Sequence, residues 1–182
     1  TGSATTFNHS LGVPSEMIWC KRRDGLGQWA VYHSGNTASP ATQYLNLNLT
    51  NATNTSSNSW NNTDPTSTVF SVGAAGGGTN DSNEKFISYH FATLAGVSKV
   101  GSYTGTTLDI NVDCGFSNGA RFIMIKRTDS TGNWHVWDSV RGISVGNDPY
   151  LYLNTNAAQV TNTNFISPLS NGFTVTAAGG AQ

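Results

Sequence analysis

The sequence predicts an all-β fold, a β-sandwich or jelly-roll-like architecture built from two internal repeats. No window of the chain carries a sustained helical stripe of apolar residues, whereas short runs that alternate apolar and polar residues occur throughout. Segments rich in Asn, Ser, Thr and Gly separate these runs, as is typical of the turns of a sandwich. Three blocks of sequence also recur in the same order in the two halves of the chain.

The repeat is clearest in its first block, where residues 16–34 align with residues 121–139 without a gap. Two further pairs of blocks follow in the same order: residues 44–48 with 150–154, and residues 69–77 with 172–180. Chance does not readily produce three ordered matches, so we infer a duplication. The expected division is a first β repeat over residues 1–95 and a second over residues 96–182.

Each repeat is expected to open with a β-hairpin. Nearly continuous apolar runs at Met17–Arg22 and Phe122–Arg127 predict strands that are buried on both faces. The segments Asp24–Gly27 and Asp129–Gly132 favour turns, because Asp bonds to nearby backbone and Gly adopts positive φ. The residues after each turn alternate between apolar and polar, which predicts the returning strand.

The remaining strands are expected as follows: a third at Tyr44–Leu49 and Tyr150–Leu153, a fourth at Phe70–Val72 and Phe173–Val175, a fifth at Phe86–Phe91, and two bridging strands at Val100–Tyr103 and Leu108–Val112. The second repeat shows no counterpart of the fifth strand before Gln182. We expect it to be truncated at its C-terminal strand, as a piece of a longer polypeptide. Donation of that strand by a neighbouring chain is the alternative, because an open sheet edge invites pairing. One sandwich and two sandwiches fit the pattern equally well.

Composition restricts the classes of partner. Only 10% of the residues are charged, yet five Trp, six Tyr and eight Phe supply enough apolar area to build a core. A formal net charge of −1 gives no field that would attract nucleic acid or anionic lipid. No run approaches the roughly 20 apolar residues of a membrane span, so membrane insertion is not expected. The one basic run, Lys21–Arg23, is expected to be a solvated strand end rather than an anion site.

No catalytic, cofactor-binding or metal-binding residue is predicted, and the chain is expected not to be an enzyme. The four histidines are scattered and lack the spacing of zinc ligands, and no GxSxG motif is present. Glycoside hydrolysis requires two carboxylates that face each other across the sugar, but the few acidic residues lie mostly in turns. Cys20 and Cys114 are expected to be buried thiols rather than a disulfide.

Two polar segments resemble ligand loops only in composition. Gly73–Gly78 lacks the GK[ST] ending of a phosphate-binding loop and is expected to be a flexible loop. Asn80–Glu84 lacks the ligand spacing of a calcium loop and is expected to be a hydrated turn.

Aromatic residues are the best candidates for a binding surface, because exposed rings can stack on the CH faces of sugars. Trp29 and Trp134 recur in both hairpins and are expected to lie in the core. For Tyr32 and Trp137 the pattern leaves core and surface open. Trp60 lies in a loop of Asn and Ser and is expected to be the most exposed ring. The candidate ligand-binding residues are therefore Trp60, Tyr32 and Trp137.

Three stretches of the chain, residues 97–105, 122–139 and 169–175, resemble a repeat domain found in structural proteins of marine and cyanobacterial phages. The first repeat is similar to the same domain through Leu11–Pro14 and Trp29–His33. The resemblance covers nearly the whole chain. It implies a tail-fibre-like or other structural protein on the virion surface, with other virion proteins as partners, as a homo-oligomer. It implies no catalytic residues.

Three functions remain, from different classes. The favoured one is a non-enzymatic phage virion structural protein, a tail-fibre or surface-exposed particle component that contributes to host attachment. The alternative is a carbohydrate-binding adhesin module that recognises host surface glycan through polar loops and an exposed ring. The least favoured is a polysaccharide depolymerase. Duplication favours the first two, since repeats extend reach and multiply weak binding sites.

Overall fold

The computed structural model describes residues 2–177, and it confirms the predicted all-β sandwich class. All pairs of named strands are antiparallel. One 3₁₀ turn, η1 (Pro40–Thr42), accompanies the strands in this part of the chain. No helix in these residues has the length and apolar character to cross a membrane. The strands are β1 (Thr5–Asn8), β2 (Met17–Arg22), β3 (Trp29–His33), β4 (Gln43–Asn46), β5 (Asn54–Thr55), β6 (Val69–Val72), β7 (Phe86–Phe91), β8 (Ile110–Asp113), β9 (Phe122–Lys126), β10 (Trp134–Asp138), β11 (Leu151–Tyr152), β12 (Ile166–Leu169) and β13 (Gly172–Val175).

The chain divides into two compact units. Unit 1 runs through Thr93 and adds the short segments Val100–Ser102 and Thr128–Ser130. Unit 2 takes in Leu94–Lys99, Tyr103–Arg127 and the chain from Thr131 onward. The first change of unit therefore falls close to the expected division between residues 95 and 96, whereas the two short segments of unit 1 were not expected.

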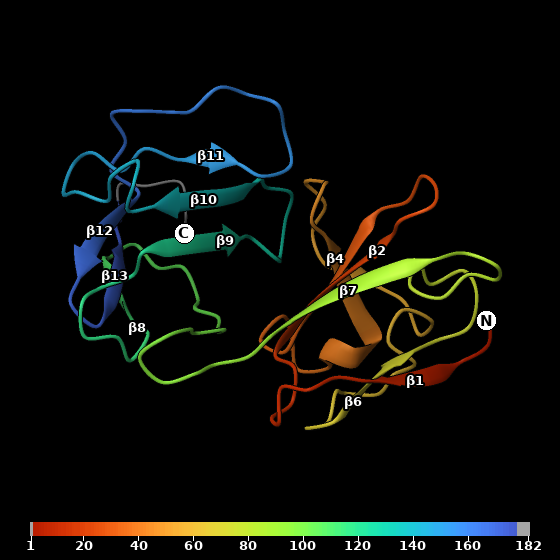
Figure 1. Cartoon of the computed structure of the whole chain (residues 1–182). Helices are drawn as coiled ribbons and strands as arrows, with labels where there is room; N and C mark the ends of the chain where they lie inside the picture. The colour runs from red at the N-terminus through yellow and green to blue at the C-terminus, as the bar shows by residue number, and fades with distance from the viewer. Residues whose placement is uncertain (1, 178–182) are drawn as a thin grey trace. The chain divides into compact units, whose positions relative to one another are not determined.

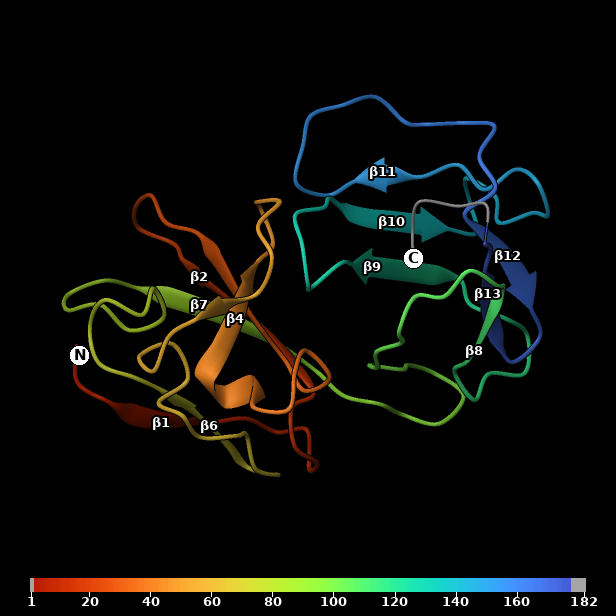
Figure 2. The same ribbon diagram turned by 180° about the vertical axis from the view of Figure 1, so that it is seen from behind.

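Unit 1 packs two antiparallel layers against each other. A five-stranded sheet in the order β5-β4-β3-β2-β7 forms one layer, and the β1–β6 pair forms the other. Figures 1 and 2 show the β1–β6 pair lying below the sheet that contains β2, β4 and β7. The buried residues between the layers come from β2, β3, β6 and one loop: Ile18, Cys20, Ala30, Tyr32, Trp60, Phe70 and Val72.

Unit 2 also consists of two sheets. One has the order β11-β10-β9 and the other β12-β13-β8. In Figures 1 and 2 the second sheet runs crosswise at one end of the first, as in orthogonal sheet packing. Its buried core is Cys114, Ile123, Trp137, Tyr150, Ile166, Phe173 and Val175.

The two predicted hairpins, β2–β3 and β9–β10, form with the same strand register. In both, the Trp that begins the returning strand donates its backbone N–H to an Asn side chain. Trp29 donates to Oδ1 of Asn48 at 3.0 Å, and Trp134 donates to Oδ1 of Asn154 at 2.8 Å. These matched bonds support the duplication inferred from the sequence.

Several details of the strand prediction are wrong. The β2 strand is not buried on both faces: Ile18 and Cys20 are buried, while Trp19 between them is half-buried. Val100–Tyr103 forms no strand, and β1, β5 and β12 were not predicted. Within residues 2–177, β9 lies at the edge of its sheet, whereas the equivalent β2 is flanked by both β3 and β7.

Candidate functional site

The three predicted ligand-binding rings are buried, so the expectation that Trp60 is the most exposed ring is wrong, and Tyr32 and Trp137, for which core and surface were both open, lie in the core. Trp60, Tyr32 and Trp137 retain 1%, 3% and 0% of their exposed area. Tyr32 and Trp60 pack edge to face in the core of unit 1, with ring centroids 5.8 Å apart. The polar atoms of both rings are bonded within the protein: Trp60 Nε1 donates to the carbonyl of Gln43 at 2.9 Å, and the Tyr32 hydroxyl donates to Asp64 at 3.0 Å.

The Gly-rich segment explains why Trp60 is buried in spite of its polar neighbours. A Cβ on Gly73 or Gly77 would collide with the backbone of Asn58, so these glycines allow the Trp60 loop to lie directly on this segment. The Ser59 hydroxyl donates to the carbonyl of Gly77 at 3.1 Å. Gly73 and Gly77 are therefore packed against the Trp60 loop, whereas residues 74–76 and Gly78 between and beyond them are exposed.

In unit 2 the corresponding buried ring is bonded to a buried carboxylate. Trp137 Nε1 donates to the carbonyl oxygen of Asp148 at 3.1 Å and to its Oδ2 at 3.0 Å. Asp148 is fully buried, and its Oδ2 also accepts the backbone N–H groups of Phe165 at 3.0 Å and Ile166 at 2.8 Å. Sequence reasoning counted Asp148 only among acidic residues that lie mostly in turns, and it missed this role because the donors lie on a distant segment.

Three aromatic rings lie together on the side of the five-stranded sheet of unit 1 that faces away from the β1–β6 pair. Trp19 on β2 pairs with Tyr89 on β7, so period-two alternation places their side chains on the same side. Tyr89 is 44% exposed, while Trp19 and Trp29 are half-buried. Trp29 lies nearly parallel to Tyr89 (22°) with centroids 6.3 Å apart, and Trp19 meets Tyr89 edge-on at 6.4 Å. We call Trp19, Trp29 and Tyr89 the aromatic face.

Sequence reasoning missed most of the aromatic face. Trp29 and Trp134 were both assigned to the core. The assignment is correct for Trp134, which is buried, and wrong for Trp29, which is half-buried. The alternation of residues 86–91 could have placed Tyr89 on one side of a strand. Its proximity to Trp29 depends on β7 pairing with β2, and no local pattern indicates that pairing.

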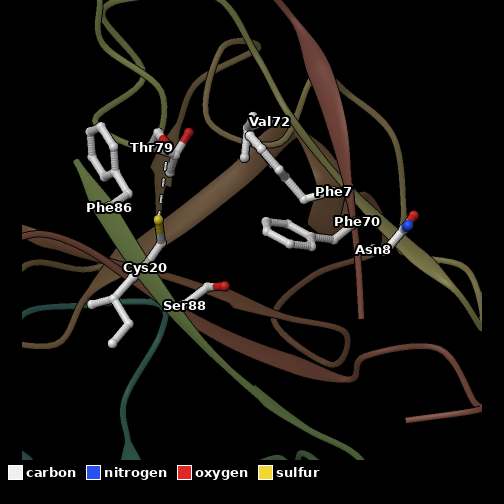
Figure 3. Close-up of a pocket in the computed structure, with 9 residues that line it drawn as sticks. Phe7, Asn8, Cys20, Phe70, Val72, Thr79, Phe86 and Ser88 are labelled. Atoms are coloured by element: carbon white, nitrogen blue, oxygen red, sulfur yellow. Dashed lines mark hydrogen bonds between the residues drawn. The ribbon is translucent and has the colours of Figure 1, made fainter. Parts of the chain in front are cut away.

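A cavity of about 190 Å³ lies between the two layers of unit 1. Figure 3 shows Phe7 beside Phe70 on one side of it and Phe86 on the other, with the Cys20 thiol pointing toward the carbonyl of Thr79. Burial raises the pKa of Cys20 to about 12, so the thiol stays protonated at neutral pH and is a poor nucleophile. Both cysteines are buried free thiols, as expected.

The histidines are packed among other side chains. His90 stacks on His9 at 5.3 Å, its Nδ1 lies 3.0 Å from the hydroxyl of Ser15, and its Nε2 lies 2.9 Å from that of Ser88. Burial lowers the pKa of His90 to about 4, and His9 adds to the shift. Ser15 is itself buried, so its contact with His90 gives no accessible nucleophile. Burial also lowers the pKa of His33 and of His135.

A single ion-pair group lies at the end of the β2 strand. Arg22 bonds Asp24 at 3.0 Å through Nε and pairs with Glu84 through Nη1. The hydrogen bond from Arg22 lowers the pKa of Asp24. Within residues 2–177, no three His, Cys, Asp or Glu side chains come together in a group that could hold a metal ion.

Comparison with known proteins finds one family. Residues 1–182 match a family described as a domain of unknown function (DUF7483). No curated protein and no solved structure matches the chain.

Proposed function

The chain belongs to the DUF7483 family, and we propose that it is a non-enzymatic structural protein of a phage particle, a tail-fibre or other surface-exposed component that contributes to host attachment. The observation that carries the proposal is the duplicated β unit with its long polar loops, which resembles repeats of phage structural proteins along nearly the whole chain. Partners would be other virion proteins, as a homo-oligomer, and the site of action would be the virion surface.

The state of the ionisable side chains supports a non-enzymatic role. Asp148 is committed to buried backbone donors, and Asp24 is committed to Arg22. Asp138 accepts the backbone N–H of Arg141 at 3.0 Å and pairs with its side chain. His90 has partners at both ring nitrogens. Each of these groups stabilises local structure, and none has the exposed, activated geometry that acid–base or nucleophilic catalysis requires.

Particle composition tests the proposal. Phage whose genome encodes this chain would be purified by density gradient, and the particle proteins would be quantified by mass spectrometry. The proposal predicts the chain at a stoichiometry of several copies per particle. A chain found in the lysate but missing from infectious particles would rule the proposal out.

A second candidate function, a carbohydrate-binding adhesin module, is favoured by the aromatic face. The rings first expected to bind sugar are buried, but Trp29 and Tyr89 present a near-parallel pair on the surface of unit 1. Adsorption of phage to host cells in the presence of excess purified chain separates the candidates. Saturable binding that blocks adsorption would favour the adhesin, and unimpeded adsorption would favour a purely structural component.

A further inference from the structure

We propose that the aromatic face of unit 1, together with three cationic side chains beside it, binds an acidic polysaccharide. The sugar rings would stack on Trp29 and Tyr89, and their carboxylate or sulfate groups would pair with Lys21, Arg23 and Lys85. The inference rests on the proposed function, because a protein on the surface of a phage particle would come into contact with polysaccharides of the host surface.

The rings supply the apolar part of the site. Trp29 on β3 and Tyr89 on β7 extend across β2 and lie 6.3 Å apart at 22° to each other. Trp19, between them on β2, supports Tyr89 edge-on, and its indole N–H is buried with no hydrogen-bond partner. The negative face of an aromatic ring attracts the weakly positive CH groups of a pyranose, so two near-parallel rings can each contact a sugar of the chain.

The cations lie on the same side of the sheet. Lys21 is two residues from Trp19 on β2, and its cross-strand partner on β3 is Trp29. Arg23 is the first residue beyond β2, and its backbone N–H donates to the carbonyl of Lys85 at 2.8 Å, which brings these two residues side by side. Arg23 and Lys85 are exposed and Lys21 is half-buried.

The neighbouring carboxylates do not neutralise this group. Asp24 and Glu84 are the acidic residues at this end of β2 and β7, and both are paired with Arg22. Asp24 also accepts the backbone N–H of Lys85 at 3.1 Å. The four cations Lys21, Arg22, Arg23 and Lys85 outnumber these two carboxylates, so the six groups together keep a net charge of +2 (four positive charges minus two negative ones). Sequence reasoning assigned the basic run Lys21–Arg23 to a solvated strand end. In the structure Arg22 is held by two ion pairs, whereas Lys21 and Arg23 would face the ligand.

The combination selects an acidic polysaccharide over other polyanions. A neutral glycan would use the rings but not the charges. A nucleic acid would use both, but the chain as a whole carries a formal charge of −1, which opposes the long-range attraction that such binding depends on. Unit 2 gives an internal comparison, since the equivalent Trp134 is buried and no strand equivalent to β7 flanks β9 within residues 2–177.

The test is equilibrium binding of the whole chain to four immobilised polymers: polygalacturonate, dextran sulfate, unmodified dextran and single-stranded DNA. We expect binding to polygalacturonate or to dextran sulfate that weakens as salt is raised, and no comparable binding to dextran or DNA. Preference between the two acidic polymers would identify the acid group. Binding that is as tight to dextran or to DNA would overturn the inference.

Variants locate the site. Tyr89→Ala removes a ring that is already 44% exposed, so the fold should persist, and binding should weaken about tenfold. Lys85→Gln should weaken binding about two- to fivefold and reduce its salt dependence. The matched controls are Phe122→Ala and Arg121→Gln, which remove an exposed ring and an exposed cation of unit 2. Equal binding by the site variants and their controls would overturn the inference.

The two proposals fail separately. A chain that is present in particles but binds neither acidic polymer would overturn the acidic-glycan site and leave the virion role standing. A chain that binds polygalacturonate but is missing from particles would overturn the virion role alone.

Discussion

Replacement of the buried carboxylate of Asp148 should be the most damaging single change in unit 2. Asp148→Ala removes the acceptor of the part-buried backbone N–H of Phe165 and of the buried backbone N–H of Ile166. The indole of Trp137 keeps the carbonyl of residue 148 as an acceptor at 3.1 Å, so it adds little to the loss. Each orphaned donor costs about 1–3 kcal/mol, so the free energy of unfolding should fall by about 2–6 kcal/mol.

Hydrogen exchange measured by mass spectrometry is the suitable assay, because it reports on each unit separately. Peptides that cover residues 160–177 should exchange much faster in Asp148→Ala, while peptides from residues 5–93 should be unchanged. Asp113→Ala is the control, since Asp113 is exposed and bonds only the N–H of Gly115 in the solvated turn. Unchanged protection of Phe165 and Ile166 in Asp148→Ala would refute this reasoning.

Three further changes test unit 1. Trp60→Ala removes a ring that is 1% exposed, so urea titrations should show a free energy of unfolding that is lower by about 3–5 kcal/mol. A loss below about 1 kcal/mol would contradict the burial of Trp60 in the core. Gly77→Ala should shift the same urea midpoint downward, because the new Cβ meets the backbone of Asn58, and an unshifted midpoint would show that the loop does not lie there. The pKa of His90 is lowered to about 4 in the folded chain by burial and by His9, so the unfolded chain binds more protons below about pH 6.5. The free energy of unfolding should therefore fall as the pH is lowered from 6.5 to 4, less steeply in His90→Gln, and identical pH profiles of the two proteins would contradict the burial of this ring.

Local patterns predicted the hairpins of this fold but not all of its edges. The β2–β3 hairpin depends on alternation and on a turn rich in Asp and Gly, and both can be read within twenty residues. By contrast, β12 contains Pro168, which argues against a strand in sequence and is tolerated here because β12 is at a sheet edge. The β1 strand is mostly exposed, and only its pairing with β6 defines it.

The candidate site was harder to predict, because exposure of a ring is set by distant parts of the chain. Trp60 is surrounded in sequence by Asn and Ser, and its burial depends on glycines that begin at Gly73. Trp29 and Trp134 occupy equivalent places in the repeat, yet Trp29 reaches the surface beside Tyr89 and Trp134 is buried. A duplicated sequence therefore does not ensure duplicated surfaces.

The most direct test of the central proposal is antibody labelling of intact particles. An antibody raised against the purified chain and coupled to gold would be applied to infectious particles before and after they are disrupted. A component on the virion surface that contributes to attachment predicts gold on the outside of intact particles and neutralisation of adsorption by the antibody. Labelling only after disruption, or no labelling in either state, would contradict a role on the virion surface.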